Sequence, residues 1–171
     1  IQIVQEPYFS YFLFLFQPIT GSMTAFERFN STLEHFDDEE QFFQHASMFS
    51  SQIVEHVKNK QAYDNFSHFD MNAYKPVHSI GKQNLYNQNN AGQTFVSIDL
   101  KKANFQALRF YDQKLVDNND SYESFVKNIV DTHDYFVESK QIRQVIFGNL
   151  NPKRQQNIQK YMISLFCEHP R

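Results

Sequence analysis

Apolar side chains recur every three or four positions along most of the chain, and this spacing predicts helices. A first helix is expected behind the capping-box pattern Thr24-Ala-Phe-Glu27. A second should follow the acidic run 37–40, because acidic side chains stabilise a helix N-terminus. Others are expected at 121–130, at 139–148 and from Pro152 onward. The apolar positions that set this pattern are Phe26, Phe29, Leu33, Phe36, Phe42, Phe43, Ala46, Phe49, Ile53, Val57, Ile142, Val145, Ile146, Ile158 and Leu165.

One stretch departs from helical spacing. Phe95, Val96 and Ile98 form a short apolar run of β-prone residues, which predicts a buried strand over about 95–98. The pattern then continues to Arg109 as an apolar-faced helix in which Phe105 should be buried. With only 4 Gly and 5 Pro, an all-β fold is disfavoured. The predicted fold class is therefore α+β, predominantly helical with a few short strands and the central strand at about 95–98.

Four regions are expected along the chain: an apolar N-terminal segment (1–20), a Phe-rich helical region (21–74), a polar loop (75–93) and a strand-helix core with basic C-terminal helices (94–171). Residues 8–16 read YFSYFLFLF, which is too short for a membrane span. This run is interpreted as a buried strand or as a segment that binds a protein partner. Because Gly21-Ser22-Met23 resembles a vector scar before an initiator methionine, residues 1–20 are either a fused piece or an ordinary strand and turn.

Composition narrows the function classes. The net charge of −3 gives no overall attraction to nucleic acid, so any such binding must be local. Cys167 is the single cysteine, which excludes an internal disulfide framework and a Cys-rich zinc site, and an intracellular location is the simplest inference. The chain has no Gly-rich phosphate loop, no Gly-x-Ser-x-Gly elbow and no His-Glu-x-x-His motif.

Two groups of polar residues are candidates for chemistry. Asp99 follows the expected strand, where a carboxylate can either cap the next helix or act as a metal ligand or general base. Lys140, Arg143, Lys153 and Arg154, together with Lys160, form the densest cluster of positive charge, which suits either phosphate binding or a solvated helix surface.

Together, FVSIDLKKANFQALR (95–109) and SKQIRQVIFGNLNPKR (139–154) resemble the first palm and finger motifs of family A DNA polymerases and phage-type single-subunit RNA polymerases. Arg143-Gln-Val-Ile-Phe147-Gly148 has the finger-motif spacing, with Arg in place of Lys. The two stretches are also similar to uncharacterised proteins of protists and large DNA viruses. The pattern departs at Asn104, where the family has Glu, and no second metal-binding Asp motif follows Arg154.

The resemblance implies a part, or a degenerate relative, of a template-dependent nucleotidyltransferase that binds nucleic acid. On this interpretation Asp99 would be catalytic and would hold magnesium, and Phe147 would stack near the nascent base pair. Lys140 and Arg143 would contact the incoming triphosphate, and Lys153 and Arg154 would add contacts to nucleic acid. The alternative is a non-catalytic structural or interaction subunit that docks through its Phe-rich N-terminal region, residues 8–16.

Overall fold

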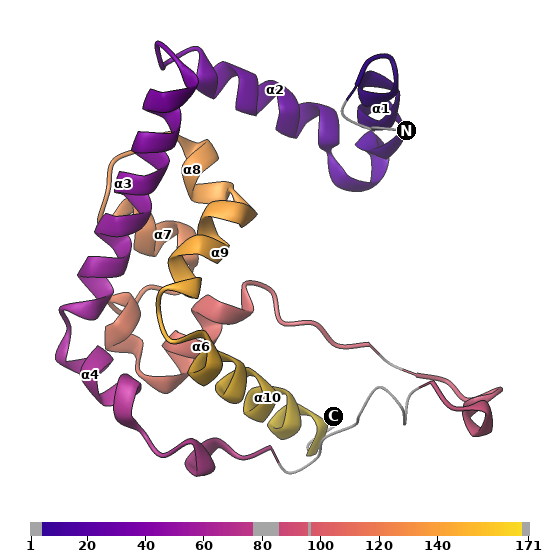
Figure 1. Cartoon of the computed structure of the whole chain (residues 1–171). Coiled ribbons are helices and arrows are strands. Elements are labelled where there is room, and N and C mark those ends of the chain that lie inside the picture. The colour runs from indigo at the N-terminus through magenta and orange to yellow at the C-terminus, as the bar shows by residue number, and fades with distance from the viewer. Residues whose placement is uncertain (1–4, 77–85, 96, 169–171) are drawn as a thin grey trace.

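The computed structural model of the chain describes residues 5–76, 86–95 and 97–168, and every regular element in these residues is a helix (Figure 1). The α-helices and short 3-10 helices (η) are, in order, α1 (Tyr8–Thr20), α2 (Ser22–Leu33), α3 (Glu39–Lys58), α4 (Gln61–His68), η1 (Met71–Tyr74), η2 (Gln88–Asn90), α6 (Ala103–Tyr111), η3 (Gln113–Val116), α7 (Tyr122–Lys127), α8 (Asp134–Glu138), α9 (Lys140–Gly148) and α10 (Pro152–Glu168).

The prediction of an α+β fold with a central strand at 95–98 is wrong. No described residue lies in a strand, and the side chains of Phe95 and Ile98 are 55 % and 41 % exposed. Val96, the middle of the expected strand, falls outside the described residues. A strand leaves its backbone polar groups unpaired unless another strand lies beside it, and no other described segment offers that pairing. The fold is all-helical where it is described.

The interpretation of residues 8–16 as a buried strand is also wrong, because they form most of α1. A nearly continuous apolar run has no periodicity that separates a strand from a helix, and a helix satisfies its backbone hydrogen bonds without a neighbour. Gly21 ends α1 with a positive φ of 66° and its N–H donates to the Gln17 carbonyl. Because α2 begins directly after this turn, Thr24 lies inside the helix and the expected capping box does not form.

Other helix boundaries follow the sequence signals. The Asp38 carboxylate accepts a hydrogen bond from the Gln41 N–H at the start of α3. Ser121 and Ser139 cap α7 and α9 in the same way, and Pro152 is the first residue of α10. α7 ends at Lys127, short of the predicted 130. The loop predicted at 75–93 contains η2, and its residues 77–85 lie outside the described part of the chain.

A single apolar core joins the helices from α3 onward. α3 packs along α9, and α10 packs along α6. The prediction that Phe105 is buried is confirmed, and each such side chain contributes roughly 1.5–3 kcal/mol by leaving water. The large side chains at the centre of this core are Phe49, Ile53, Phe66, Phe105, Leu108, Leu115, Tyr122, Phe125, Phe136, Ile146, Phe147 and Leu150.

Helix α1 and the N-terminal part of α2 stand apart from this core. Figure 1 shows α2 leaving the end of α3 beside α8, with α1 at its far end. The C-terminal part of α2 is tied to the body by the ring of Phe29, which lies 5.7 Å from that of Phe42 and 5.3 Å from that of Tyr135. No residue of α1 is buried. Within 5–76, 86–95 and 97–168, no helix is long and apolar enough to cross a bilayer.

Candidate interaction surface

The predicted metal carboxylate, Asp99, lies on the surface outside any helix. Helix α6 begins at Ala103, and its N-cap residue is Lys102, so the alternative prediction that Asp99 caps the helix is wrong. Asp99 forms no hydrogen bond or ion pair with another described residue. The described residues contain no group of three or more His, Cys, Asp or Glu side chains placed to hold a metal ion. Nothing in the described part of the fold therefore gathers ligands around Asp99.

The two arginines of the basic cluster make contacts within the fold. The Arg143 guanidinium lies 5.6 Å from the centre of the Tyr122 ring. Burial raises the pKa of the nearby Glu123 carboxyl, but the hydrogen bond from Lys102 and the charge of Arg143 outweigh this and hold that pKa below its usual value.

Arg154 contacts a different part of the fold, the chain that follows α4. Its guanidinium lies 4.6 Å from the centre of the Phe69 ring and donates a hydrogen bond to the Phe69 carbonyl. Arg143 thus stabilises the contact between α9 and α7, whereas Arg154 stabilises the contact between α10 and the chain after α4. The two charges serve separate packing contacts.

Lys140 and Lys153 are exposed, but they lie in the first turns of two different helices, α9 and α10. Helix α9 begins at Lys140 and its 9 residues, roughly 13 Å of helix, precede the turn that leads to Lys153. Phe147 is buried in the core, where its ring centre lies 5.8 Å from that of Tyr122, so the ring has no face available for a base. No hydrogen bond, ion pair or ring contact among the described residues joins the basic cluster to Asp99, and nucleic-acid binding stays a prediction.

A different surface stands out on α1. Because α-helical residues are spaced by about 100°, the apolar side chains of α1 cover roughly half of its circumference. We call this surface the α1 face, and it comprises Tyr8, Tyr11, Phe12, Phe14, Leu15, Phe16, Pro18 and Ile19. Six of its large side chains are exposed by between 44 and 80 %. The helix contains no acidic or basic residue.

The opposite side of α1 holds the helix on α2. The ring centres of Phe9 and Phe26 are 5.0 Å apart in an edge-on contact, and the Ser22 hydroxyl donates to the Leu13 carbonyl at 2.6 Å. The Gln17 side-chain carbonyl accepts from the Met23 N–H at 2.7 Å. These contacts use the narrow side of α1, which contains its polar Gln17. The broader α1 face is consequently turned away from α2.

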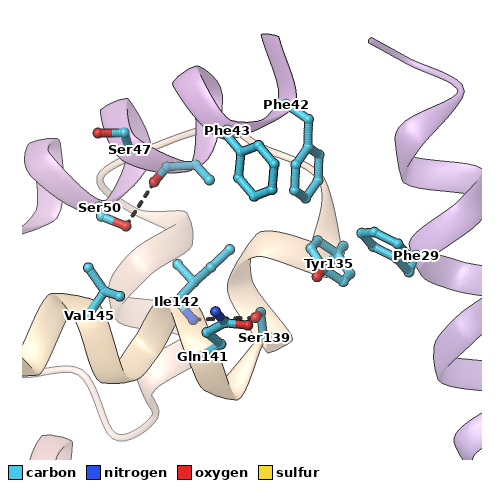
Figure 2. Close-up of a pocket in the computed structure, with 11 residues that line it drawn as sticks. Phe29, Phe42, Phe43, Ser47, Ser50, Tyr135, Ser139, Gln141, Ile142 and Val145 are labelled. Atoms are coloured by element: carbon cyan, nitrogen blue, oxygen red, sulfur yellow. Dashed lines mark hydrogen bonds between the residues drawn. The ribbon is translucent and has the colours of Figure 1, made fainter. Parts of the chain in front are cut away.

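A second uncharged surface lies between α3 and α9 (Figure 2). It is a groove of about 480 Å³, with Phe29 of α2 and Tyr135 of α8 at one end. We call it the α3–α9 groove, and its lining residues are Phe29, Phe42, Phe43, Ala46, Ser47, Ser50, Tyr135, Ser139, Gln141, Ile142 and Val145. None of these side chains is acidic or basic.

Two of the polar groups in this groove are already engaged. The Ser50 hydroxyl donates to the Ala46 carbonyl at 2.8 Å, and the Ser139 hydroxyl accepts from the Ile142 N–H at 3.4 Å (Figure 2). The groove therefore presents mainly apolar surface. Such a lining is suited to bind apolar side chains by burial, and it offers no pair of groups for acid–base chemistry.

Sequence patterns alone did not identify this groove, although one signal was present. Phe42 and Phe43 are adjacent on α3 and so lie about 100° apart around the helix, which prevents both from facing the same core. Phe42 is buried, whereas Phe43 is exposed. Val145 and Ile146 show the same division on α9, with Val145 exposed in the groove. Adjacent pairs of large apolar residues thus mark an apolar surface outside the core.

The chain was also compared with known proteins. No protein-family model, no curated protein and no solved structure matches the chain.

Proposed function

We propose that this protein is a non-catalytic interaction subunit that docks onto a protein partner through the α1 face. The observation that carries the proposal is the exposure of that face: an uncharged apolar helix with no buried residue, fixed by its opposite side to α2. Residues 8–16 supply most of this surface, which is the region that the sequence singled out for a protein partner.

The size of the α1 face supports this function. An aromatic side chain offers about 150–250 Å², so six large side chains exposed by 44 to 80 % present on the order of 600 Å² of apolar area. The largest apolar patch of a typical monomer is roughly 300–600 Å² and is often functional. A stable protein interface buries roughly 800 Å² on each partner. The α1 face thus supplies most of one side of such an interface.

The chemistry of α1 favours a protein over a phosphate-bearing partner. Helices that lie in a lipid surface carry Lys and Arg along their polar side, and nucleic-acid contacts need the same charges. α1 has neither residue. The central part of a protein–protein interface is depleted in charge and enriched in aromatic residues such as Tyr and Phe, as the α1 face is.

Site-specific photo-crosslinking tests this function. Phe14, which is 70 % exposed on α1, is replaced by a photoreactive phenylalanine, and so, in a second protein, is Phe166, which is 66 % exposed on α10. Irradiation in extracts of the natural host should give an adduct of defined mass from position 14 that position 166 does not give. Adding Ile19→Lys to the first protein should remove that adduct.

Ile19 is 80 % exposed, so the charge perturbs the α1 face and leaves the core unchanged. Equal circular dichroism spectra with and without the substitution serve as the control. The same adducts from both positions, or an adduct from position 14 that survives Ile19→Lys, would contradict a docking role for α1.

A further inference from the structure

The partner surface can be specified from the same chain, in an inference that rests on the proposed function. We infer that the α1 face of one copy binds in the α3–α9 groove of a second copy, so that two chains form a reciprocal dimer. Each copy then supplies one helix and one groove, as two-fold symmetry requires.

The groove and α1 match in the way that a helix binds in a groove. Such helices insert side chains spaced at i, i+3, i+4 and i+7. Tyr11, Phe14, Leu15 and Pro18 have this spacing, and all four are exposed. A volume of about 480 Å³ has room for a few large side chains from one side of a helix, and the rest of the helix can remain above the groove.

Charge is matched as well. Neither α1 nor the lining of the groove contains an acidic or basic side chain. Bringing them together therefore removes no charged group from water. The desolvation of a charged group would weaken the contact. The groove also exposes large apolar groups of its own, Phe43 and Val145, which gain burial from an occupant.

The area is adequate only when the contact is made twice. One α1 face presents on the order of 600 Å² of apolar side chain, and the exposed Phe43 and Val145 side chains of the groove add to the area that one contact can bury. Two such contacts reach or exceed the 1,200–2,000 Å² of total surface that is usual for stable complexes. A reciprocal arrangement therefore buries part of both apolar surfaces on each copy.

The two surfaces border the same helix. On α2, Phe26 holds α1 through Phe9, and Phe29, one turn later, lines the groove. The hydrogen bonds from Met23 and Thr24 to Gln17 keep α1 on the N-terminal half of α2, away from the groove of its own chain. The α1 of a second copy can reach this groove without breaking those hydrogen bonds, because it approaches on its own α2.

Complementation between two charge variants tests the inference on the full chain. Phe14→Lys places a charge on the α1 face, and Val145→Glu places one in the groove, where Val145 is 50 % exposed. By analytical ultracentrifugation the parent should be a dimer, and each variant should weaken dimerisation by roughly 30-fold or more, as loss of an interface hot spot does.

Mixing the two variants should restore dimers. In the mixed pair, one contact joins the unaltered α1 to the unaltered groove, and the other joins Lys at position 14 to Glu at position 145. Phe166→Lys on α10 is the matched control and should dimerise like the parent. Equal circular dichroism spectra for all proteins establish that folding is unchanged.

The outcomes separate this inference from the function on which it rests. A monomeric parent that still gives an adduct from position 14 with another protein would overturn the second copy as partner and leave docking through α1 intact. A dimer that Phe14→Lys dissociates and Val145→Glu does not would mean that α1 pairs with something other than the groove. A monomeric parent without any adduct would overturn both proposals.

Discussion

The ring of Phe9 meets the ring of Phe26 edge-on at 5.0 Å, and this contact joins α1 to α2. Its position explains how an apolar helix stays ordered with no buried residue, since the contact and the hydrogen bonds to Gln17 fix one side of α1. The other side is left for a partner.

Replacing Phe9 by Ala should therefore release α1 while the body of the protein stays folded. The edge-on contact contributes about 0.5–1.5 kcal/mol beyond simple burial, and α1 is too short to hold its helix alone in water. Hydrogen exchange followed by mass spectrometry should show faster exchange in residues 8–20 and unchanged exchange in α6 and α10. Phe166→Ala on α10, a ring that is 66 % exposed and lies outside the proposed contact, is the control and should exchange like the parent.

Phe105→Ala should destabilise the protein by about 3–5 kcal/mol, because the ring is fully buried and its loss leaves a cavity. Phe110→Ala on the same helix is the matched control, since that ring is 44 % exposed and should cost less than half as much. Urea titration measures both changes. Equal free energies of unfolding for the two variants would contradict the orientation of α6.

Stability should fall as the pH is lowered through about 6.5, in part because of His45. Burial and the charge of His133 hold the pKa of His45 below its usual value of 6.5. The unfolded chain then takes up a proton that the folded chain resists, so protonation favours unfolding. His35, His133 and the Phe36 and Phe136 rings surround this region, and the Thr132 hydroxyl lies 3.0 Å from His45 Nε2.

His45→Gln keeps a group that can bond Thr132 and removes the titration. Urea titrations at pH 7.5, 6.5 and 5.5 should show a shallower loss of stability for this variant than for the parent. Asp117 has a lowered pKa: burial raises it, and the hydrogen bonds from Lys60 and His56 outweigh that effect. Its stabilisation is lost only at lower pH, as its carboxyl is protonated. Identical pH profiles for parent and His45→Gln would remove His45 as a cause.

Nucleic-acid binding, if it occurs, should depend weakly on salt. Arg143 and Arg154 are engaged by Tyr122 and Phe69, which leaves Lys140 and Lys153 as the exposed ones among the four basic residues predicted to bind nucleic acid. Two phosphate contacts on a single strand give a slope of log K against log salt no steeper than roughly −1.4. Fluorescence anisotropy of a labelled oligonucleotide across a salt series measures this slope.

Lys140→Gln and Lys153→Gln should each make that slope shallower by roughly 0.7 without loss of folding. A slope much steeper than that of two contacts, unaffected by both substitutions, would place a phosphate path elsewhere on the protein. Arg154→Ala is unsuitable for this purpose, because it also removes the hydrogen bond to the Phe69 carbonyl.

The sequence by itself determined the features that depend on neighbours within a few residues. Asp38, Ser121 and Ser139 each accept a hydrogen bond from an N–H three positions later, so the starts of α3, α7 and α9 could be predicted. The burial of Phe105 followed from helical spacing in the same way. The apolar character of residues 8–16 also singled out the surface on which the proposed function rests.

Tertiary structure alone decided the rest, because each remaining feature depends on groups far apart in the chain. A strand at 95–98 needs a second strand, and a continuous apolar run such as residues 8–16 can become a helix or a strand depending on the partners of its backbone hydrogen bonds. Phe147 occupies the core because α7 brings Tyr122 against it, and Arg154 is engaged because the chain after α4 brings Phe69 beneath it. The groove exists only where α3 and α9, separated by some eighty residues, lie side by side. Local spacing carries no information on such contacts.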